Sequence, residues 1–133
     1  MDPHALLNEY DLGLPLPLAG EEERRRAVPS EIWDRLSEVK RALGALLGSR
    51  LRDVRLFGSY ARGQFDEESD VDFLVLVDDL RREERAALVD LVVHLSGRGI
   101  ILSPLVLGTS QLDELRAQER LIAEDIDREG LSV

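Results

Sequence analysis

A short apolar segment that follows two aspartates constrains the fold of this chain more than any other feature. Residues 70–77 read DVDFLVLV, and every side chain after Asp72 is apolar, with a large share of Val and Phe. Such a run predicts a buried β-strand. Side chains two residues apart in a strand lie on the same face, so Asp70 and Asp72 point to one side. The sequence therefore predicts a carboxylate pair at the edge of a buried strand.

The segments around this strand predict an alternation of helices and short strands. Their order favours an α/β (α+β) fold, in which helices cover one face of a small mixed sheet and leave the opposite face or an edge for a partner. Apolar residues recur at helical spacing after Ser30, which is the candidate N-cap of the first long helix. The expected helices are 30–47, 60–62, 80–96 and 110–129, the expected strands are 53–57, 70–77 and 100–107, and residues 131–133 are expected to form a tail.

The chain of 133 residues fits one domain, which we expect to span 30–133 after an N-terminal arm at 1–29. Within the arm, Pro15 and Pro17 interrupt regular structure. The leucines beside them leave two interpretations open, a surface segment or an arm that docks on its own domain or on a partner. The charged run EEERRR at 21–26 is interpreted as a solvated segment whose charges pair with one another.

Composition narrows the classes of function. The formal net charge of −10 argues against nucleic acid as a general ligand, but a metal ion and a few arginines can still bind a small polyanion such as ATP. The chain has no cysteine and two histidines, which argues against thiolate chemistry and histidine-rich metal sites. No apolar run has the length of a transmembrane helix, and the first residues lack the basic start of a signal peptide. We therefore expect a cytoplasmic protein with no membrane partner.

The residues that carry chemistry lie in the segment LFGSYARGQFDEESDVDFLVLV. Gly58 allows a close backbone approach to a ligand, and Ser59 adds a hydroxyl group. A short helix after this turn would direct backbone N–H groups and Arg62 toward phosphate oxygens. The carboxylates of Asp70 and Asp72 suit Mg²⁺, which binds one or two carboxylates together with water and phosphate.

Gly-Ser, ten residues, and then Asp-x-Asp is a pattern that resembles the polymerase-β-like nucleotidyltransferase superfamily, and its small prokaryotic branch in particular. The resemblance covers about residues 30–133. It implies that ATP or another nucleoside triphosphate binds at Gly58, Ser59 and Arg62, and that Asp70 and Asp72 hold Mg²⁺ and form the catalytic set with Ser59. It also implies transfer of AMP to a protein hydroxyl, with a helical HEPN-type protein as partner, as in toxin-antitoxin pairs. A homo-oligomer is a further option.

The chain departs from this family at one position. The family carries a third carboxylate on the next core strand, but that strand reads GIILSPLVLG here, with Ser103 or Pro104 in the place of the acid. Serine is a poor Mg²⁺ ligand and no base near neutral pH. Three functions therefore stay open: protein nucleotidylation, a catalytically impaired module that binds a nucleotide or a partner, and small-molecule nucleotidylation. Tyr60 has two interpretations, stacking on a base or packing at the turn.

Overall fold

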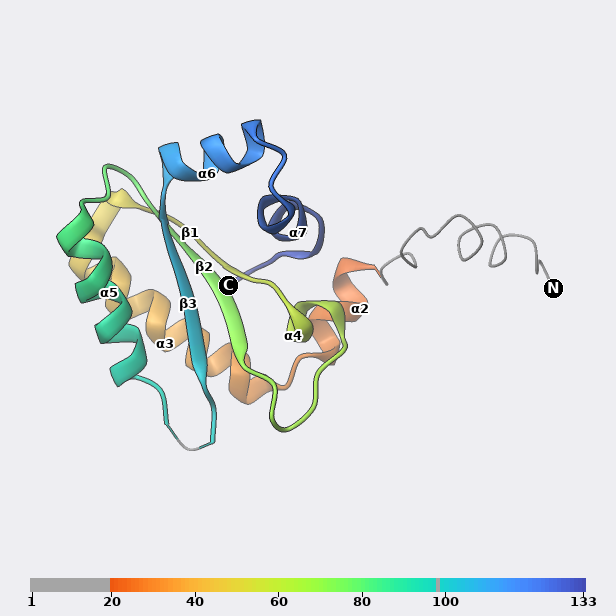
Figure 1. Ribbon diagram of the computed structural model, residues 1–133. Coiled ribbons are helices and arrows are strands. Elements are labelled where there is room, and N and C mark those ends of the chain that lie inside the picture. The colour runs from red at the N-terminus through yellow and green to blue at the C-terminus, as the bar shows by residue number, and fades with distance from the viewer. Residues whose placement is uncertain (1–19, 98) are drawn as a thin grey trace.

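The sheet is built around the strand that the sequence predicts most firmly. The computed structural model describes residues 20–97 and 99–133, so most of the predicted arm lies outside the described residues. The strands pair in the order β3-β2-β1-β4, with β2 parallel to β3 and antiparallel to β1 (Figure 1). The elements are α2 (Glu21–Ala27), α3 (Ser30–Leu47), the 3-10 turn η1 (Gly48–Arg50), β1 (Leu51–Leu56), α4 (Ser59–Arg62), β2 (Val71–Val77), α5 (Arg82–His94), β3 (Leu102–Gly108), α6 (Thr109–Ala117), α7 (Leu121–Glu129) and β4 (Leu131–Ser132).

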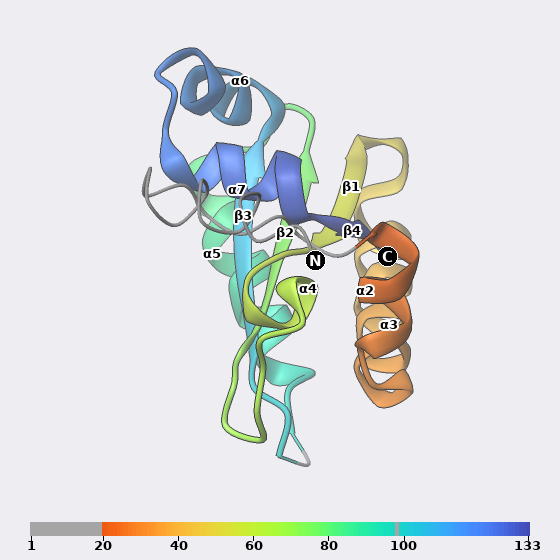
Figure 2. The same cartoon turned by 90° about the vertical axis from the view of Figure 1, so that its right-hand side faces the viewer.

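The two faces of β2 bury two different groups of side chains. Phe73 and its alternate neighbours pack in a core with the buried faces of α3 and α5. Leu74 points the other way and packs against Leu112 of α6 and Ile126 of α7. Figures 1 and 2 show α3 on one side of the sheet, with α6 and α7 toward the other. The fold class is confirmed, but helices pack on both faces and not on one.

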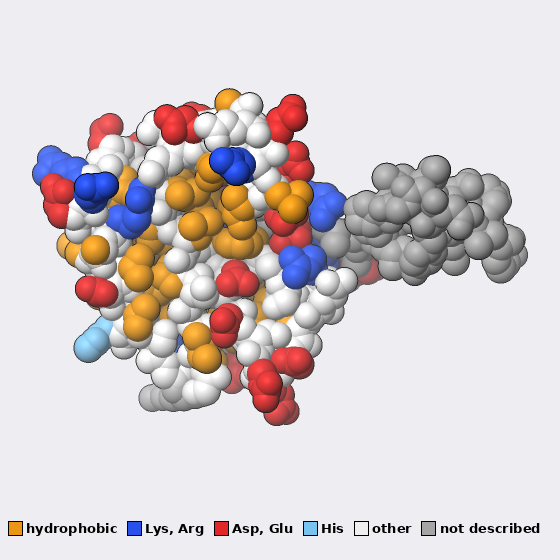
Figure 3. All heavy atoms as spheres, viewed as in Figure 1, with side chains coloured by type: hydrophobic (Ala, Val, Ile, Leu, Met, Phe, Trp, Pro, Cys, Tyr) orange, Lys and Arg blue, Asp and Glu red, His pale blue; other side chains and the backbone are white. Residues whose placement is uncertain are grey.

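The second face of the sheet is only partly covered. Leu76, Leu105 and Leu107 are partly buried against the smaller core. Figure 3 views the molecule as in Figure 1 and shows hydrophobic side chains gathered over the sheet below α6. A part of the opposite face thus remains open, as the sequence predicted.

The predicted C-terminal helix is two helices, because the chain turns between α6 and α7. Glu119 has a φ of 53°, a left-handed conformation that interrupts the helix. This turn lets the apolar face of α7 pack on the sheet. The predicted tail is also wrong: Leu131 is fully buried and pairs with Leu56 as strand β4. At the other end of the chain, Pro29 and not Ser30 is the N-cap of α3.

The charged run before α3 is not simply solvated. It forms α2, in which Arg24 is buried and donates to the carbonyl oxygens of Ala61 at 3.1 Å and Glu129 at 2.6 Å. The guanidinium of Arg25 lies 5.0 Å from the centre of the Trp33 ring. The Glu22–Arg26 pair matches the predicted self-pairing. The described part of the arm therefore packs on the domain, while the boundary at residue 29 stays a prediction.

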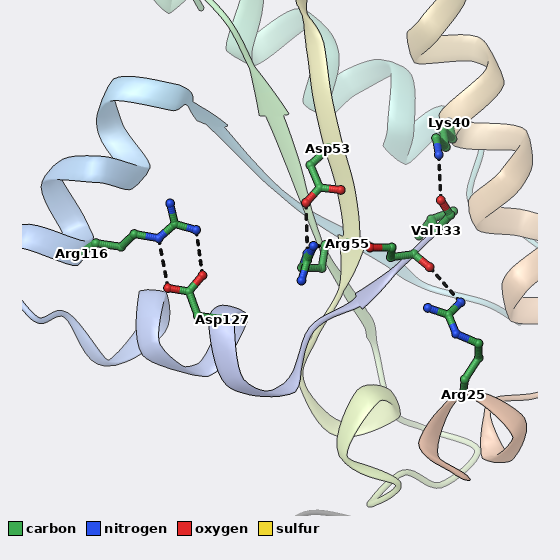
Figure 4. A network of polar contacts seen from close by, with 8 residues as sticks. Arg25, Lys40, Asp53, Arg55, Arg116, Asp127 and Val133 are labelled. Carbon is green, nitrogen blue, oxygen red and sulfur yellow. Dashed lines mark hydrogen bonds and ion pairs between the residues drawn. The ribbon is translucent and has the colours of Figure 1, made fainter. Parts of the chain in front are cut away.

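Polar contacts join the C-terminal residues to α2 and α3, and join α6 to α7 (Figure 4). Arg25 donates to the Ser132 carbonyl at 2.9 Å, and Lys40 donates to the Val133 carbonyl at 2.7 Å. Arg116 of α6 donates twice to Asp127 of α7, at 3.0 and 2.7 Å.

No helix in residues 20–97 and 99–133 combines the length and the apolar character needed to cross a membrane.

Candidate nucleotide and metal site

Gly58 places the motif turn directly against the second aspartate of the pair. Its φ of 77° and ψ of −156° lie in a region that side chains other than glycine rarely adopt. A Cβ atom at this position would lie 2.6 Å from Asp72 Oδ2. The neighbouring Phe57 N–H donates to the Asp72 carbonyl at 3.0 Å, which ties the turn to the start of β2. The structure thus brings together the two halves of the motif, which ten residues separate in the sequence.

The two aspartates differ in exposure. Asp70 is exposed just before β2, whereas Asp72 is partly buried within the strand. Burial raises the pKa of the Asp72 carboxyl above its ordinary value, and the charge of Asp70 adds to the rise. A hydrogen bond from Ser103 and the positive charge of Arg62 act in the opposite direction. A divalent cation beside the pair would relieve the repulsion between the two carboxylates.

Ser103 lies directly beside Asp72 in the parallel pairing of β2 and β3, and Pro104 lies beside Phe73. Of the two positions named for the third acid, Ser103 is therefore the one next to the proposed metal ligand. Among the residues that the structure describes, no group of three acidic or histidine side chains could hold a metal ion. The remaining donor set of two carboxylates still suits Mg²⁺, which completes its octahedron with water and phosphate oxygens.

Ser59 and Arg62 lie on α4, immediately after Gly58. Ser59 is partly exposed, and the side chain of Arg62 is 33% exposed. Arg62 Nε donates to Gln64 Oε1 at 3.2 Å, and Nη1 donates to Glu129 Oε1 at 3.1 Å. The backbone N–H of Arg62 is used within the turn, because it donates to the Gly58 carbonyl at 3.0 Å. The guanidinium is therefore the group of Arg62 that can meet a phosphate.

Glu129 is a residue of this site that sequence reasoning missed. Its side chain is 1% exposed, and its Oε1 accepts a hydrogen bond from the Gly58 N–H at 2.9 Å as well as the bond from Arg62. One sequence feature indicates that Glu129 faces the core. It follows the buried Ile126 by three residues and therefore lies on the same face of the helix. Sequence alone does not say what a carboxylate on that face contacts.

Tyr60 packs at the turn. It is buried, and its ring stacks on Phe65 with 4.4 Å between the ring centres. The packing interpretation is therefore confirmed.

Asp66 of the following loop is exposed and accepts hydrogen bonds from Glu68 and Ser69, which closes a local turn.

The fold and this constellation define the chain as a nucleotidyltransferase-type protein. A family model described as a nucleotidyltransferase domain matches residues 36–126, which include the motif from Gly58 to Asp72. The chain belongs to this family. Glu129 and helix α2 lie outside the matched segment.

Two curated relatives come from Methanocaldococcus jannaschii. The chain is 37% identical over 91 residues to "Putative protein adenylyltransferase MJ0141", in a match that covers 64% of this chain and 92% of the relative. It is 44% identical over 43 residues to "Putative protein adenylyltransferase MJ0604", and that match covers 32% of this chain and 43% of the relative.

Two solved structures are similar at low sequence identity. One is described as a toxin-antitoxin with AMP-PNP and matches with 21% identity and a TM-score of 0.49, over 71% of this chain and 69% of the other. The other is described as "a putative nucleotidyltransferase from Sulfolobus solfataricus" and matches with 18% identity and a TM-score of 0.48, over 89% and 90% of the two chains.

Proposed function

We propose that this protein binds a nucleoside triphosphate with Mg²⁺ and transfers its nucleotide, AMP in the first instance, to a hydroxyl group of a protein. The observation that carries the proposal is the close fit between Gly58 and Asp72. A Cβ at residue 58 would lie 2.6 Å from Asp72 Oδ2, so the turn expected to hold phosphate lies beside the carboxylate expected to hold the metal. The sequence-based expectation of a cytoplasmic location suits this substrate.

Each residue of the motif has a distinct task in this proposal. Gly58 admits the phosphates close to the backbone, while the Ser59 hydroxyl and the Arg62 guanidinium bind their oxygens. Asp70 and Asp72 hold Mg²⁺, which when bound supplies charge neutralisation for the phosphates. The protein thereby orients the α-phosphate so that the acceptor oxygen forms a bond to the α-phosphorus. The bond from the α-phosphorus to the β-phosphate oxygen breaks, pyrophosphate leaves, and the hydroxyl proton passes to water. Positioning and electrostatics, rather than a covalent intermediate on the protein, supply the rate enhancement.

The acceptor is proposed from two supports. The name of the relative from M. jannaschii refers to protein adenylyltransferase activity, and the motif resembles small nucleotidyltransferases that pair with HEPN proteins. We therefore propose a helical HEPN-type partner whose hydroxyl accepts AMP, with this chain as the antitoxin of the pair. The partly open sheet face beside Asp72 offers a surface for such a partner.

Titration of Mg·ATP into the purified protein tests the proposed site, with calorimetry as the readout. The double variant Asp70→Asn/Asp72→Asn is expected to lose binding that depends on Mg²⁺. The matched control is Asp78→Asn/Asp79→Asn, which changes two acids just after the far end of β2 and is expected to leave affinity unchanged. Absence of binding at millimolar ATP by the wild type would refute the proposal.

One observation favours a second function. Ser103 lies beside Asp72, where the resemblance implies an acid, so the base expected at this position is replaced by a serine. A module that binds Mg·ATP or a partner without transfer would need no such base. Binding without release of pyrophosphate, in the presence of a HEPN-type partner, would favour this alternative over the enzyme.

A further inference from the structure

A buried carboxylate from the C-terminal helix reaches the phosphate-binding side of the motif. Glu129 Oε1 accepts from the Gly58 N–H at 2.9 Å and from Arg62 Nη1 at 3.1 Å. One oxygen atom thus contacts both the glycine that fits against Asp72 and the arginine expected to meet the phosphates. Glu129 is 1% exposed, so water does not compete for these bonds.

The second oxygen of this carboxylate argues against a purely structural role. Glu129 Oε2 is buried and has no hydrogen-bond partner among the described residues. Burial of a carboxylate costs desolvation free energy, and Glu129 recovers only part of it, because one of its two oxygens has no hydrogen bond. A residue chosen for stability alone would not need to be an acid here.

The backbone of Glu129 is also held against α4. Arg24 donates from a single nitrogen to the Glu129 carbonyl at 2.6 Å and to the Ala61 carbonyl at 3.1 Å. This double contact fixes the last turn of α7 relative to the short helix that carries Arg62. Glu129 is therefore held by its backbone, through Arg24, and by its side chain, through Gly58 and Arg62.

The arginine that Glu129 holds keeps one nitrogen for a ligand. Nη1 of Arg62 is bonded to Glu129 and Nε is bonded to Gln64, while no described residue accepts a hydrogen bond from Nη2. Gly58, whose N–H shares the Glu129 oxygen with Arg62, lies directly against Asp72, so the Arg62–Glu129 pair is next to the proposed metal ligand. Holding two of its nitrogens restricts where the third can point.

We propose that Glu129 is a positioning residue for the triphosphate: it holds the Gly58 turn and directs Arg62 toward the phosphates beside Asp72. The inference rests on the proposed nucleotide site and adds a residue outside the matched family segment. Glu129 touches neither the substrate nor the reacting atoms, so it acts through Arg62.

Glu129→Gln tests this role, because the amide oxygen still accepts from the Gly58 N–H while the charge that orients Arg62 is lost. Affinity for Mg·ATP is expected to fall about tenfold, the change for one charge-assisted hydrogen bond. The melting temperature is expected to change little, since the partly exposed Arg62 stays solvated and the amide oxygen keeps the bond from the Gly58 N–H. Glu84→Gln is the matched control: it breaks a carboxylate pair with Arg50 and should leave ATP affinity unchanged.

A double-variant cycle shows whether the effect passes through Arg62. On the Arg62→Ala background, Glu129→Gln should change affinity less than twofold. An equal loss on both backgrounds, or unaltered affinity in Glu129→Gln, would overturn the inference and leave the nucleotide site intact. Failure of the wild type to bind Mg·ATP would instead refute the site itself, and the inference with it.

Discussion

Gly58→Ala is the substitution that most directly tests how the turn and Asp72 fit together. The native backbone has a φ of 77° and a ψ of −156°, where alanine is strained by about 1–3 kcal/mol. The added Cβ would also lie 2.6 Å from Asp72 Oδ2 and 3.1 Å from Asp72 Cβ. Rotation of the carboxylate relieves the first contact, at a cost of about 1 kcal/mol for a side chain moved from its rotamer. The second contact remains and requires a small backbone shift.

Gly48→Ala supplies the matched control. Gly48 has a φ of 57° and a ψ of −132°, a similar strained region, but no atom lies within 4 Å of a Cβ built there. We therefore expect Gly48→Ala to lower the free energy of unfolding by about 2 kcal/mol, from backbone strain alone. Gly58→Ala should lower it by about 3 kcal/mol, because displacement of Asp72 adds to the strain. Urea unfolding of both variants measures the difference, compared through the midpoints at a common slope.

The affinity for Mg·ATP should differ more between Gly58→Ala and Gly48→Ala than their stability does. Displacement of the Asp72 carboxylate should weaken Mg·ATP binding by about tenfold or more, since about 1.4 kcal/mol of lost interaction has that effect. Gly48→Ala should bind like the wild type. On an Asp72→Ala background, the excess cost of Gly58→Ala over Gly48→Ala should shrink, because the carboxylate is gone, while the contact with the Cβ atom that alanine retains at position 72 persists. Equal stability and equal affinity in the two glycine variants would refute a close fit between Gly58 and Asp72.

Two further predictions concern charges. Ser103→Asp adds a carboxylate beside Asp72 and should tighten Mg²⁺ binding about tenfold in calorimetry, because an added carboxylate raises the ligand charge of the site; an unchanged affinity would show that this side chain does not reach the metal. The hydrogen bond from Arg50, followed by the backbone N–H of Arg81, lowers the pKa of Glu84 from 4.5 to about 2, so this pair stabilises the fold above pH 4.5 and ceases to do so as the pH falls toward 2. The difference in unfolding free energy between wild type and Glu84→Gln should follow that window in urea titrations, and a difference that persists at pH 2 would contradict the assignment.

The parts of the fold that the sequence predicted are those with strong local patterns. The apolar run after Asp72 and the helical spacing of α3 are each set by residues close together in the chain. The motif was found for a similar reason, since Gly58 and Asp72 flank one loop and carry recognisable residue types. Local patterns of this kind need no knowledge of what packs against them.

The parts that were missed depend on contacts between distant segments. The break at Glu119 has no glycine or proline to mark it, and it exists because α7 packs back on the sheet. Strand β4 has two residues, too few for a pattern, and forms by pairing with β1. Arg24 lies in a run that was predicted to be solvated, and Glu129 was not singled out, yet both are buried and meet from segments 105 residues apart.

These long-range contacts meet at the turn that contains Gly58 and Arg62. Their position helps to distinguish nucleotide binding from a role in partner contacts alone. Arg24 from α2 and Glu129 from α7 both bind the segment that contains Gly58 and Arg62, and neither lies in the matched family segment. A fold retained only for partner contacts has no physical need for a buried acid that contacts the Gly58 turn and has one unpaired oxygen. Such an acid is useful where the position of Arg62 must be defined before a charged ligand arrives, because preorganised groups lose little on binding. The arrangement therefore favours nucleotide binding in both candidate functions.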